Sequence, residues 1–156
     1  KLHRNFQGYT THRDTDLLGL GVSAISQIGN VMIQNKKELK AYYADVSDDT
    51  LEGFTQQTGV VSSEDDIIRA HVIKELMCHY EISFSKLEKK FKFDPVSYFE
   101  REVTLLENFV SDGVLELTND GYRVTEIGVF FIRNIAMCFD TYLSKQLKTS
   151  QYSRVI

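Results

Sequence analysis

The spacing of hydrophobic residues divides the chain into two parts near residue 62. From there onward, apolar positions recur at intervals of three and four, which is the period of an amphipathic helix. Ser62 and Ser63 precede three acidic residues, a pattern typical of a helix start. The helix that follows carries one apolar stripe, formed by Ile68, Val72, Leu76 and Tyr80. A short apolar stretch at 82–84 then leads into a shorter helix from Ser85.

The next predicted helix has clear signals at both ends. Asp94 and Pro95 form a cap followed by proline at the first helical position. Gly113 follows Asp112 and suits the left-handed position that ends a helix. Between them the apolar residues are Val96, Phe99, Val103, Leu106 and Val110.

A β-hairpin and a long helix are predicted after residue 113. Two β-like runs, 114–117 and 122–125, flank the turn sequence Asn119-Asp120-Gly121, in which Asp-Gly favours a tight hairpin. Aromatic residues at helical spacing then predict a final helix from about Glu126 to Lys148.

The part before residue 62 has weaker periodicity. Glycines at positions 8, 19 and 21 indicate backbone that bends sharply or passes close to another group. A polar helix is predicted from Lys36 to Val46, and 47–61 is interpreted as a long loop. The predicted fold class is therefore mainly α: a winged-helix-like C-terminal domain with a small β-hairpin, preceded by an irregular segment.

A winged helix suggests DNA binding, but the charge pattern opposes it. The polar face of the 95–112 helix is interpreted as carrying one arginine, Arg101, against Glu100, Glu102, Glu107 and Asp112. The net charge is −4, whereas nucleic-acid binding depends on attraction to phosphate. We therefore expect no nucleic-acid partner.

The composition limits the classes of protein to which this chain could belong. A chain of 156 residues with 42% hydrophobic and 26% charged residues is long enough for one folded domain with a core. No apolar run reaches 18 residues, so no membrane span is expected. The first residue is not Met and no apolar signal region follows, which indicates a start inside a longer protein. Cys78 and Cys138 are far apart in sequence, as expected for free thiols in a reducing cytosol.

No complete catalytic motif occurs in the sequence. His71 and His79 lie eight residues apart, whereas zinc-binding helices place their ligands four apart. Gly19-Leu20-Gly21 is a fragment of a dinucleotide fingerprint, with Ala24 in place of the third glycine. Asp14 and Asp16 are better interpreted as a solvated turn than as a catalytic pair.

Five segments in order carry a resemblance to a known family. They are HRNFQGYTT, DLLGLGVSAIS, AHVIKELMC, IRNIAMCFDTYL and SRVI. Together they resemble the C-terminal part of the oxygen-independent coproporphyrinogen III oxidases, HemN-type radical S-adenosylmethionine enzymes. The resemblance implies oxidative decarboxylation of coproporphyrinogen III to protoporphyrinogen IX in haem biosynthesis. It also implies S-adenosylmethionine and a [4Fe–4S] cluster held by a CxxxCxxC motif in a preceding (β/α) barrel.

The same resemblance assigns a cofactor contact within this chain. The family position that touches S-adenosylmethionine falls on Ile25, with Ala24 and Ser23 as neighbours. CxxxCxxC is absent, so this chain alone is expected to bind no cofactor and to be inactive. Arg13 and the Thr58-Gly59 pair depart from the family pattern, which leaves the role of 47–61 open. Four arginines could pair with porphyrinogen carboxylates, and the sequence ranks none of them: Arg4, Arg13, Arg133 and Arg154.

The resemblance also implies a domain organisation. Residues 1–61 would end the catalytic barrel and connect it to a C-terminal helical domain at 62–156 that covers the active site. The expected partners are the substrate and the enzyme's own barrel, in a monomeric cytoplasmic protein without membrane contact. In this chain alone, residues 1–35 are expected to be mobile or to pair with another chain. The alternative hypothesis is a stand-alone winged-helix interaction module without catalytic activity.

Overall fold

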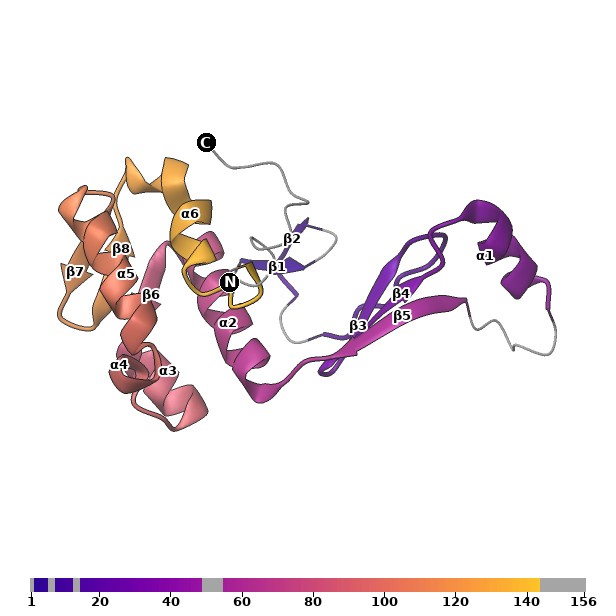
Figure 1. Cartoon of the computed structure of the whole chain (residues 1–156), viewed down its shortest axis with the longest axis horizontal. Coiled ribbons are helices and arrows are strands. Elements are labelled where there is room, and N and C mark those ends of the chain that lie inside the picture. The colour runs from indigo at the N-terminus through magenta and orange to yellow at the C-terminus, as the bar shows by residue number, and fades with distance from the viewer. Residues whose placement is uncertain (1, 6–7, 13–14, 49–54, 144–156) are drawn as a thin grey trace. The chain divides into compact units, whose positions relative to one another are not determined.

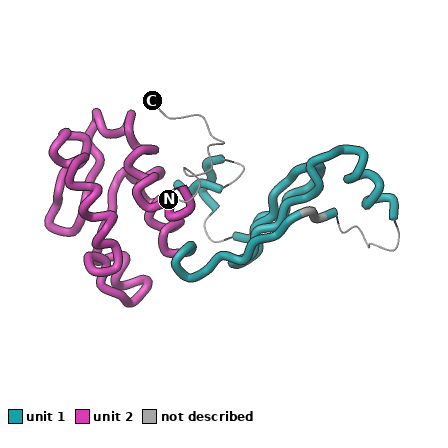
Figure 2. Tube along the Cα trace, viewed as in Figure 1, with its two compact units in different colours: residues 1–67 teal, residues 68–156 magenta. Residues whose placement is uncertain are grey.

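The chain forms two compact units. The computed structural model describes residues 2–5, 8–12, 15–48 and 55–143. Unit 1 is Lys1–Ile67 and unit 2 is Ile68–Ile156 (Figure 2). The division falls inside a helix, a few residues after the boundary predicted from the sequence.

Unit 1 is built from antiparallel strands rather than from irregular backbone. Strands β1 (His3–Asn5) and β2 (Gly8–Thr10) pair with each other, and the larger sheet has the order β3-β4-β5 (Figure 1). Its strands are β3 (Ile25–Ile28), β4 (Val31–Asn35) and β5 (Gln56–Val61). The prediction of a loop over 47–61 was therefore wrong for its second half, because β5 is defined by pairing with β4 and not by a local period.

Helix α1 (Leu39–Val46) starts three residues later than predicted from Lys36. The backbone of Lys36 is already used in the sheet: its N–H donates to the Thr55 carbonyl at 2.8 Å, and its carbonyl accepts from Ser23 at 2.8 Å. The Lys36 ammonium also forms an ion pair with Asp45 of α1, with Nζ and Oδ2 2.7 Å apart. This pair connects the end of β4 to the helix.

Unit 2 combines short helices with a three-stranded antiparallel sheet of order β6-β8-β7 (Figure 1). The helix that leads into it is α2 (Glu64–His79). The remaining elements are β6 (Glu81–Ser83), α3 (Phe84–Phe91), α4 (Pro95–Tyr98), α5 (Glu100–Ser111), β7 (Leu115–Thr118), β8 (Gly121–Val124), a 3₁₀ turn (Gly128–Phe131) and α6 (Ile132–Met137). With the sheets of unit 1, this makes the fold mixed helix and strand instead of mainly α.

The predicted 95–112 helix is interrupted at Phe99. Asp94 caps α4 as expected, accepting from the N–H groups of Val96 and Ser97. Phe99 leaves helical geometry, with φ −106° and ψ 28°, and its ring is buried. Gly113 takes the predicted left-handed conformation, with φ 72°.

Glu102 was wrongly placed on the polar face of this helix. It is 4% exposed and accepts a hydrogen bond from the Arg69 guanidinium, with Nη1 and Oε1 2.8 Å apart. Arg69 also lies 5.4 Å from the centre of the Phe99 ring. A buried carboxylate needs such a partner, and α2 supplies it.

The long final helix predicted over 126–148 is also wrong. Within the described residues, the region forms the 3₁₀ turn and then α6, which ends at Met137. Asp140 accepts hydrogen bonds from the N–H groups of Tyr142 and Leu143 at 2.9 and 3.1 Å, so it caps a new turn instead of continuing the helix. Residues 144–148 lie outside the described part.

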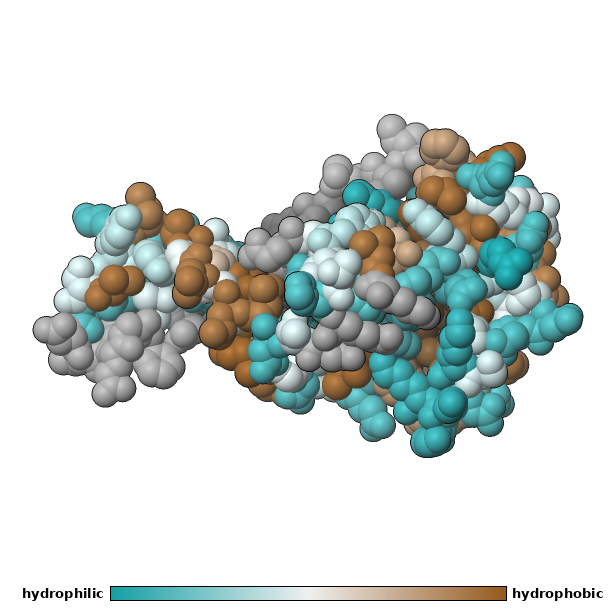
Figure 3. All heavy atoms as spheres, turned by 180° about the vertical axis from the view of Figure 1, so that it is seen from behind, coloured by the Kyte–Doolittle hydropathy of each residue, from teal (hydrophilic) through white to brown (hydrophobic). Residues whose placement is uncertain are grey.

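Buried residues differ in kind between the units. Among the described residues, the fully buried apolar side chains all belong to unit 2. They include Val72, Leu76, Phe99, Leu106, Ile135 and Phe139. In unit 1 the buried side chains are polar: Asn35, Asp45 and Thr55. Several large apolar side chains of unit 1 are exposed, among them Leu20 and Val61, while others such as Ile33 are half-buried. Hydrophobic residues are visible at the surface in Figure 3.

No membrane-spanning helix is found in the part of the chain that the structure describes: none has the required length and hydropathy together.

Candidate functional site

The predicted site residues Ala24 and Ile25 lie where the chain enters β3. Ile25 is the first residue of β3 and pairs with Gln34 of β4. Because side chains alternate along a strand, Ile25 shares one sheet face with Gln27 and Met32. Ile25 and Ala24 are half-buried and Ser23 is exposed.

The loop 19–24 that precedes Ile25 has an unusual backbone. Gly21 has φ 98°, and Ser23 has φ 59°, a left-handed conformation that is uncommon for a residue other than glycine. Gly19 packs directly on the strand: a Cβ added there would lie 2.6 Å from the Ile25 carbonyl oxygen. Gly19 and Gly21 are therefore required by the path of this loop.

Hydrogen bonds hold this loop to both strands of the β3–β4 hairpin. The Gly19 N–H donates to the Ser26 hydroxyl at 3.0 Å. The Asn35 amide donates to the carbonyls of Gly21 and Gly19 at 2.9 and 3.3 Å. The Gln34 amide donates to the Ser23 carbonyl at 3.0 Å. The sequence analysis assigned no role to Gln34 and Asn35 and included Ser26 only as the last residue of a motif, since a polar residue in a short strand gives no signal of its own.

Asp16 and Leu17 fix the approach to the loop. Leu17 and Gln27 form a two-way backbone bridge, with both N–H to carbonyl distances at 2.8 Å. The Asp16 carboxylate accepts from the Gly29 N–H at 2.8 Å. Asp16 thus ties the segment to the β3–β4 turn. Asp14 lies outside the described residues.

The other candidate groups form no catalytic set. His71 lies beside the Lys90 ammonium, 3.3 Å away, and packs its ring on Phe91. His79 lies 3.6 Å from the Glu75 carboxylate. Among the described residues, no group of three or more His, Cys, Asp or Glu side chains is arranged to hold a metal ion.

Neither cysteine forms a disulfide, and both are half-buried. Burial raises the pKa of the Cys138 thiol, which keeps it protonated and poorly nucleophilic. Of the four arginines considered for carboxylate binding, Arg13 and Arg154 lie outside the described residues. Arg4 lies over the Tyr9 ring at 5.7 Å, and Arg133 is exposed on α6.

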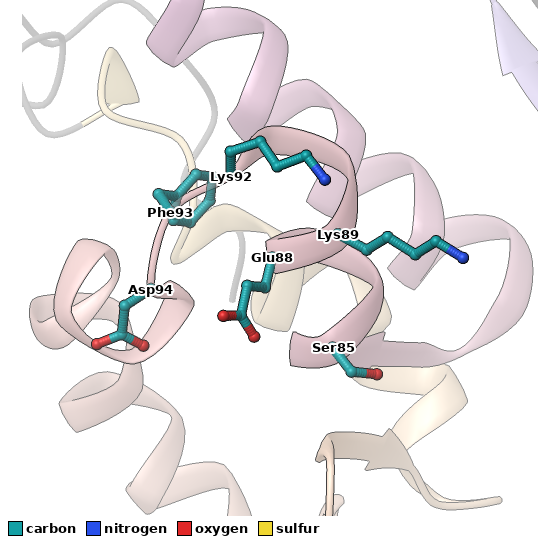
Figure 4. Close-up of a pocket in the computed structure, with 6 residues that line it drawn as sticks. All are labelled: Ser85, Glu88, Lys89, Lys92, Phe93 and Asp94. Carbon is teal, nitrogen blue, oxygen red and sulfur yellow. The ribbon is translucent and has the colours of Figure 1, made fainter.

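A pocket in unit 2 is lined by residues at the ends of helices, and we do not interpret it as a catalytic site. It is lined by Ser85, Glu88, Lys89, Lys92, Phe93 and Asp94 (Figure 4). In Figure 4 the Lys89 side chain extends away from the Glu88 and Asp94 carboxylates. Asp94 is occupied as the cap of α4, and its hydrogen bonds from Ser97 and Val96 lower its pKa. Loop 19–24 and Ile25 therefore remain the candidate site.

Comparison with known proteins gives consistent matches along the chain. Residues 62–131 match the HemN C-terminal domain. Oxygen-independent coproporphyrinogen III oxidase of Escherichia coli strain K12 is 46% identical over 155 residues, covering 99% of this chain and 33% of that protein. The enzyme of the same name from Synechocystis is 43% identical over 160 residues, covering 100% of this chain and 34% of that protein.

A solved structure agrees with the sequence matches. It is coproporphyrinogen III oxidase (HemN) from Escherichia coli, described as a radical SAM enzyme, and it matches with a TM-score of 0.85 at 47% identity. The alignment covers 90% of this chain and 32% of that one. The chain thus spans about a third of the length of the curated relatives it matches.

Proposed function

We propose that this chain helps to close the active site of an oxygen-independent coproporphyrinogen III oxidase. The chain belongs to the HemN-type enzymes of this name and corresponds to their C-terminal part. The complete enzyme would convert coproporphyrinogen III to protoporphyrinogen IX by oxidative decarboxylation of two propionate side chains. The observation that carries the proposal is the match over 99% of the chain at 46% identity.

The chain's own residues do not fit an iron–sulfur cluster. A radical SAM cluster needs three thiolates close together, and this chain has only Cys78 and Cys138, both half-buried. No cluster-binding step is therefore assigned to the chain. We place the cluster ligands in the rest of the oxidase polypeptide.

S-adenosylmethionine fits the chain better, through the Ile25 loop. Ile25 offers an aliphatic surface on one sheet face, and Ala24 and Ser23 beside it are small enough to leave room for a ligand. When bound, S-adenosylmethionine supplies the radical that begins the reaction. Ile25 would orient this molecule by packing against it and would exclude water from that side.

The two units take different roles in this proposal. Residues 1–61 end the catalytic domain and connect it to the C-terminal domain, 62–156. We interpret the latter as a winged-helix-like domain that covers the active site instead of binding DNA. The enzyme would act in the cytoplasm as a monomer, with coproporphyrinogen III and its own barrel as partners.

Anaerobic assays of two proteins test this proposal. The full-length oxidase, with its cluster, should produce protoporphyrinogen IX, measured as protoporphyrin fluorescence after oxidation. Residues 1–156 alone should produce none. Activity of residues 1–156 by themselves would contradict the proposal, as would an inactive full-length enzyme with an intact cluster.

The role of Ile25 needs its own test in the full-length enzyme. Ile25→Ala should raise the KM for S-adenosylmethionine because it removes a packing surface. Leu39→Ala is the matched control, since Leu39 is an aliphatic side chain of the same unit that is exposed at the start of α1. Equal effects of the two substitutions would refute the assignment of Ile25.

A further inference from the structure

We propose that Asn35 is a positioning residue that fixes the loop 19–24 and thereby holds Ile25 for contact with S-adenosylmethionine. The proposal rests on the function proposed above for Ile25. Asn35 would touch neither cofactor nor substrate, and it would act through the backbone that carries Ile25.

Asn35 reaches the loop at three points. Its side-chain nitrogen lies 2.9 Å from the Gly21 carbonyl oxygen and 3.3 Å from that of Gly19. Its backbone N–H donates to the Ala24 carbonyl at 2.9 Å. One residue at the end of β4 therefore binds the start, the middle and the end of the loop.

The chemistry of these contacts requires an amide. Both partners of the side chain are carbonyl oxygens, so the group facing them must donate twice, as an NH₂ group does. Asn35 is 7% exposed, and water therefore cannot easily replace it. An aspartate of the same shape would present an oxygen to two carbonyl oxygens and repel them.

The loop is coupled to Ile25 by close packing. No room exists between Gly19 and the Ile25 backbone, as the 2.6 Å approach of an added Cβ shows. The Ser26 hydroxyl, one residue beyond Ile25, accepts from the Gly19 N–H. A loop released from Asn35 would therefore shift the start of β3. The nearby bond from Gln34 to the Ser23 carbonyl is exposed to water and would restrain the loop less.

The first experiment measures S-adenosylmethionine affinity by equilibrium dialysis in the full-length oxidase with Asn35→Asp, and with Asn35→Ser in case Asp prevents folding. Either variant should weaken binding about tenfold, which is about the effect of losing one or two net hydrogen bonds. Asn30→Asp is the matched control, because it makes the same chemical change at an exposed turn of the same sheet. Unchanged affinity in a folded Asn35 variant would overturn the proposal.

A double-mutant cycle with Ile25→Ala distinguishes positioning from general destabilisation. If Asn35 acts through Ile25, then Asn35→Ser should weaken binding by less than about twofold once Ile25 is Ala. If the effects of the two substitutions multiply in full, the assignment of Ile25 stands and the role of Asn35 is overturned. If Ile25→Ala alone leaves affinity unchanged, the function proposed for Ile25 fails first.

Amide hydrogen exchange tests the role of Asn35 without requiring bound cofactor or enzyme activity. In the full-length protein, peptides covering 17–26 should exchange at least about tenfold faster in Asn35→Ser than in wild type, because the loop opens locally. Peptides from α2 and α5 should be unchanged, and Asn30→Asp should match wild type throughout. Faster exchange spread evenly over the protein would indicate a structural role only and would refute positioning.

Discussion

The two units achieve order by different means. Unit 2 buries a continuous apolar cluster, in which Leu76 and Ile135 are completely inaccessible to solvent. The buried side chains described in unit 1 are polar, and strand pairing and hydrogen bonds define its shape. Burial of apolar area is the dominant stabilising term in folding. We therefore expect unit 2 to be stable on its own and unit 1 to depend on additional contacts.

The sheet of unit 1 indicates where such contacts would form. By its register, one sheet face carries Ile28, Val31, Ile33 and Val61. Val61 is 68% exposed and Ile28 is 42% exposed. In the proposed enzyme, the rest of the oxidase would cover these side chains. Unit 2 then has a complete apolar core of its own, whereas unit 1 has an apolar sheet face that only the rest of the enzyme would bury.

The largest expected effect is loss of a core side chain from unit 2. Phe99→Ala should reduce the free energy of unfolding by about 3–5 kcal/mol, because it removes a buried ring that packs on Phe139 with centroids 5.3 Å apart. Ile33→Ala in unit 1 should cost less than about 1 kcal/mol in this chain. Urea unfolding followed by circular dichroism measures both. Similar losses of unfolding free energy for Phe99→Ala and Ile33→Ala would contradict the proposed difference between the two units.

The next effect concerns the buried ion pair of unit 2. Glu102→Gln should destabilise unit 2 by about 3 kcal/mol, because the Arg69 charge loses its buried carboxylate partner. Glu100→Gln is the control, since Glu100 is exposed on the same helix. Thermal unfolding of the two variants should differ clearly, and equal midpoints would show that the pair contributes little.

A smaller and local effect is expected at Gly19 in unit 1. Gly19→Ala should destabilise the loop and the start of β3 by about 1–3 kcal/mol, because its methyl group would overlap the Ile25 backbone. Gly59→Ala meets its nearest atom, the Met32 oxygen, only at 3.6 Å and serves as control. Exchange of peptides 17–28 should increase in the first variant alone, with unit 2 unaffected. Loss of unit 2 structure in Gly19→Ala would argue against two separate units.

The smallest effect is a pH dependence of unit 2. Hydrogen bonds from the Ser83 hydroxyl and the Ser85 N–H lower the pKa of Asp120 below its usual value of 3.8. The stabilisation is therefore present above that value and is lost as the pH falls through the lower, folded-state pKa. Asp120→Ala should remove a fraction of the acid sensitivity seen in urea midpoints between about pH 5 and 2. If Asp120→Ala left the pH dependence of the urea midpoint unchanged, the folded structure would not stabilise the ionised Asp120 carboxylate.

The sequence predicted unit 2 better than unit 1 for a physical reason. The cap at Asp94, the left-handed Gly113 and the hairpin around 119–121 depend on neighbours a few residues away, and all three are observed. The pairing of β4 with β5 joins residues separated by α1, so no local period shows it. Glu102 was misplaced because its partner, Arg69, lies in another helix.

The candidate site was predictable only in part. The residues alone indicated tight backbone around Gly19 and Gly21, and the structure gives Gly21 a positive φ and Gly19 no space for a side chain. The assignment of Ile25 and Ala24 to a cofactor came from family resemblance and stays a prediction. The contacts of Asn35 could not be predicted from the sequence, because its side chain is buried against a loop 14 and 16 residues earlier.

Native-state amide exchange of residues 1–156 alone tests the central contrast most directly. Amides of α5, β8 and the part of α2 from Ile68 onward should exchange only through global unfolding. Those of β3, β4 and β5 should exchange at least about a thousandfold faster through local opening. In the full-length oxidase, the sheet of unit 1 should become protected. Equal and slow exchange of both units in the chain alone would contradict the account.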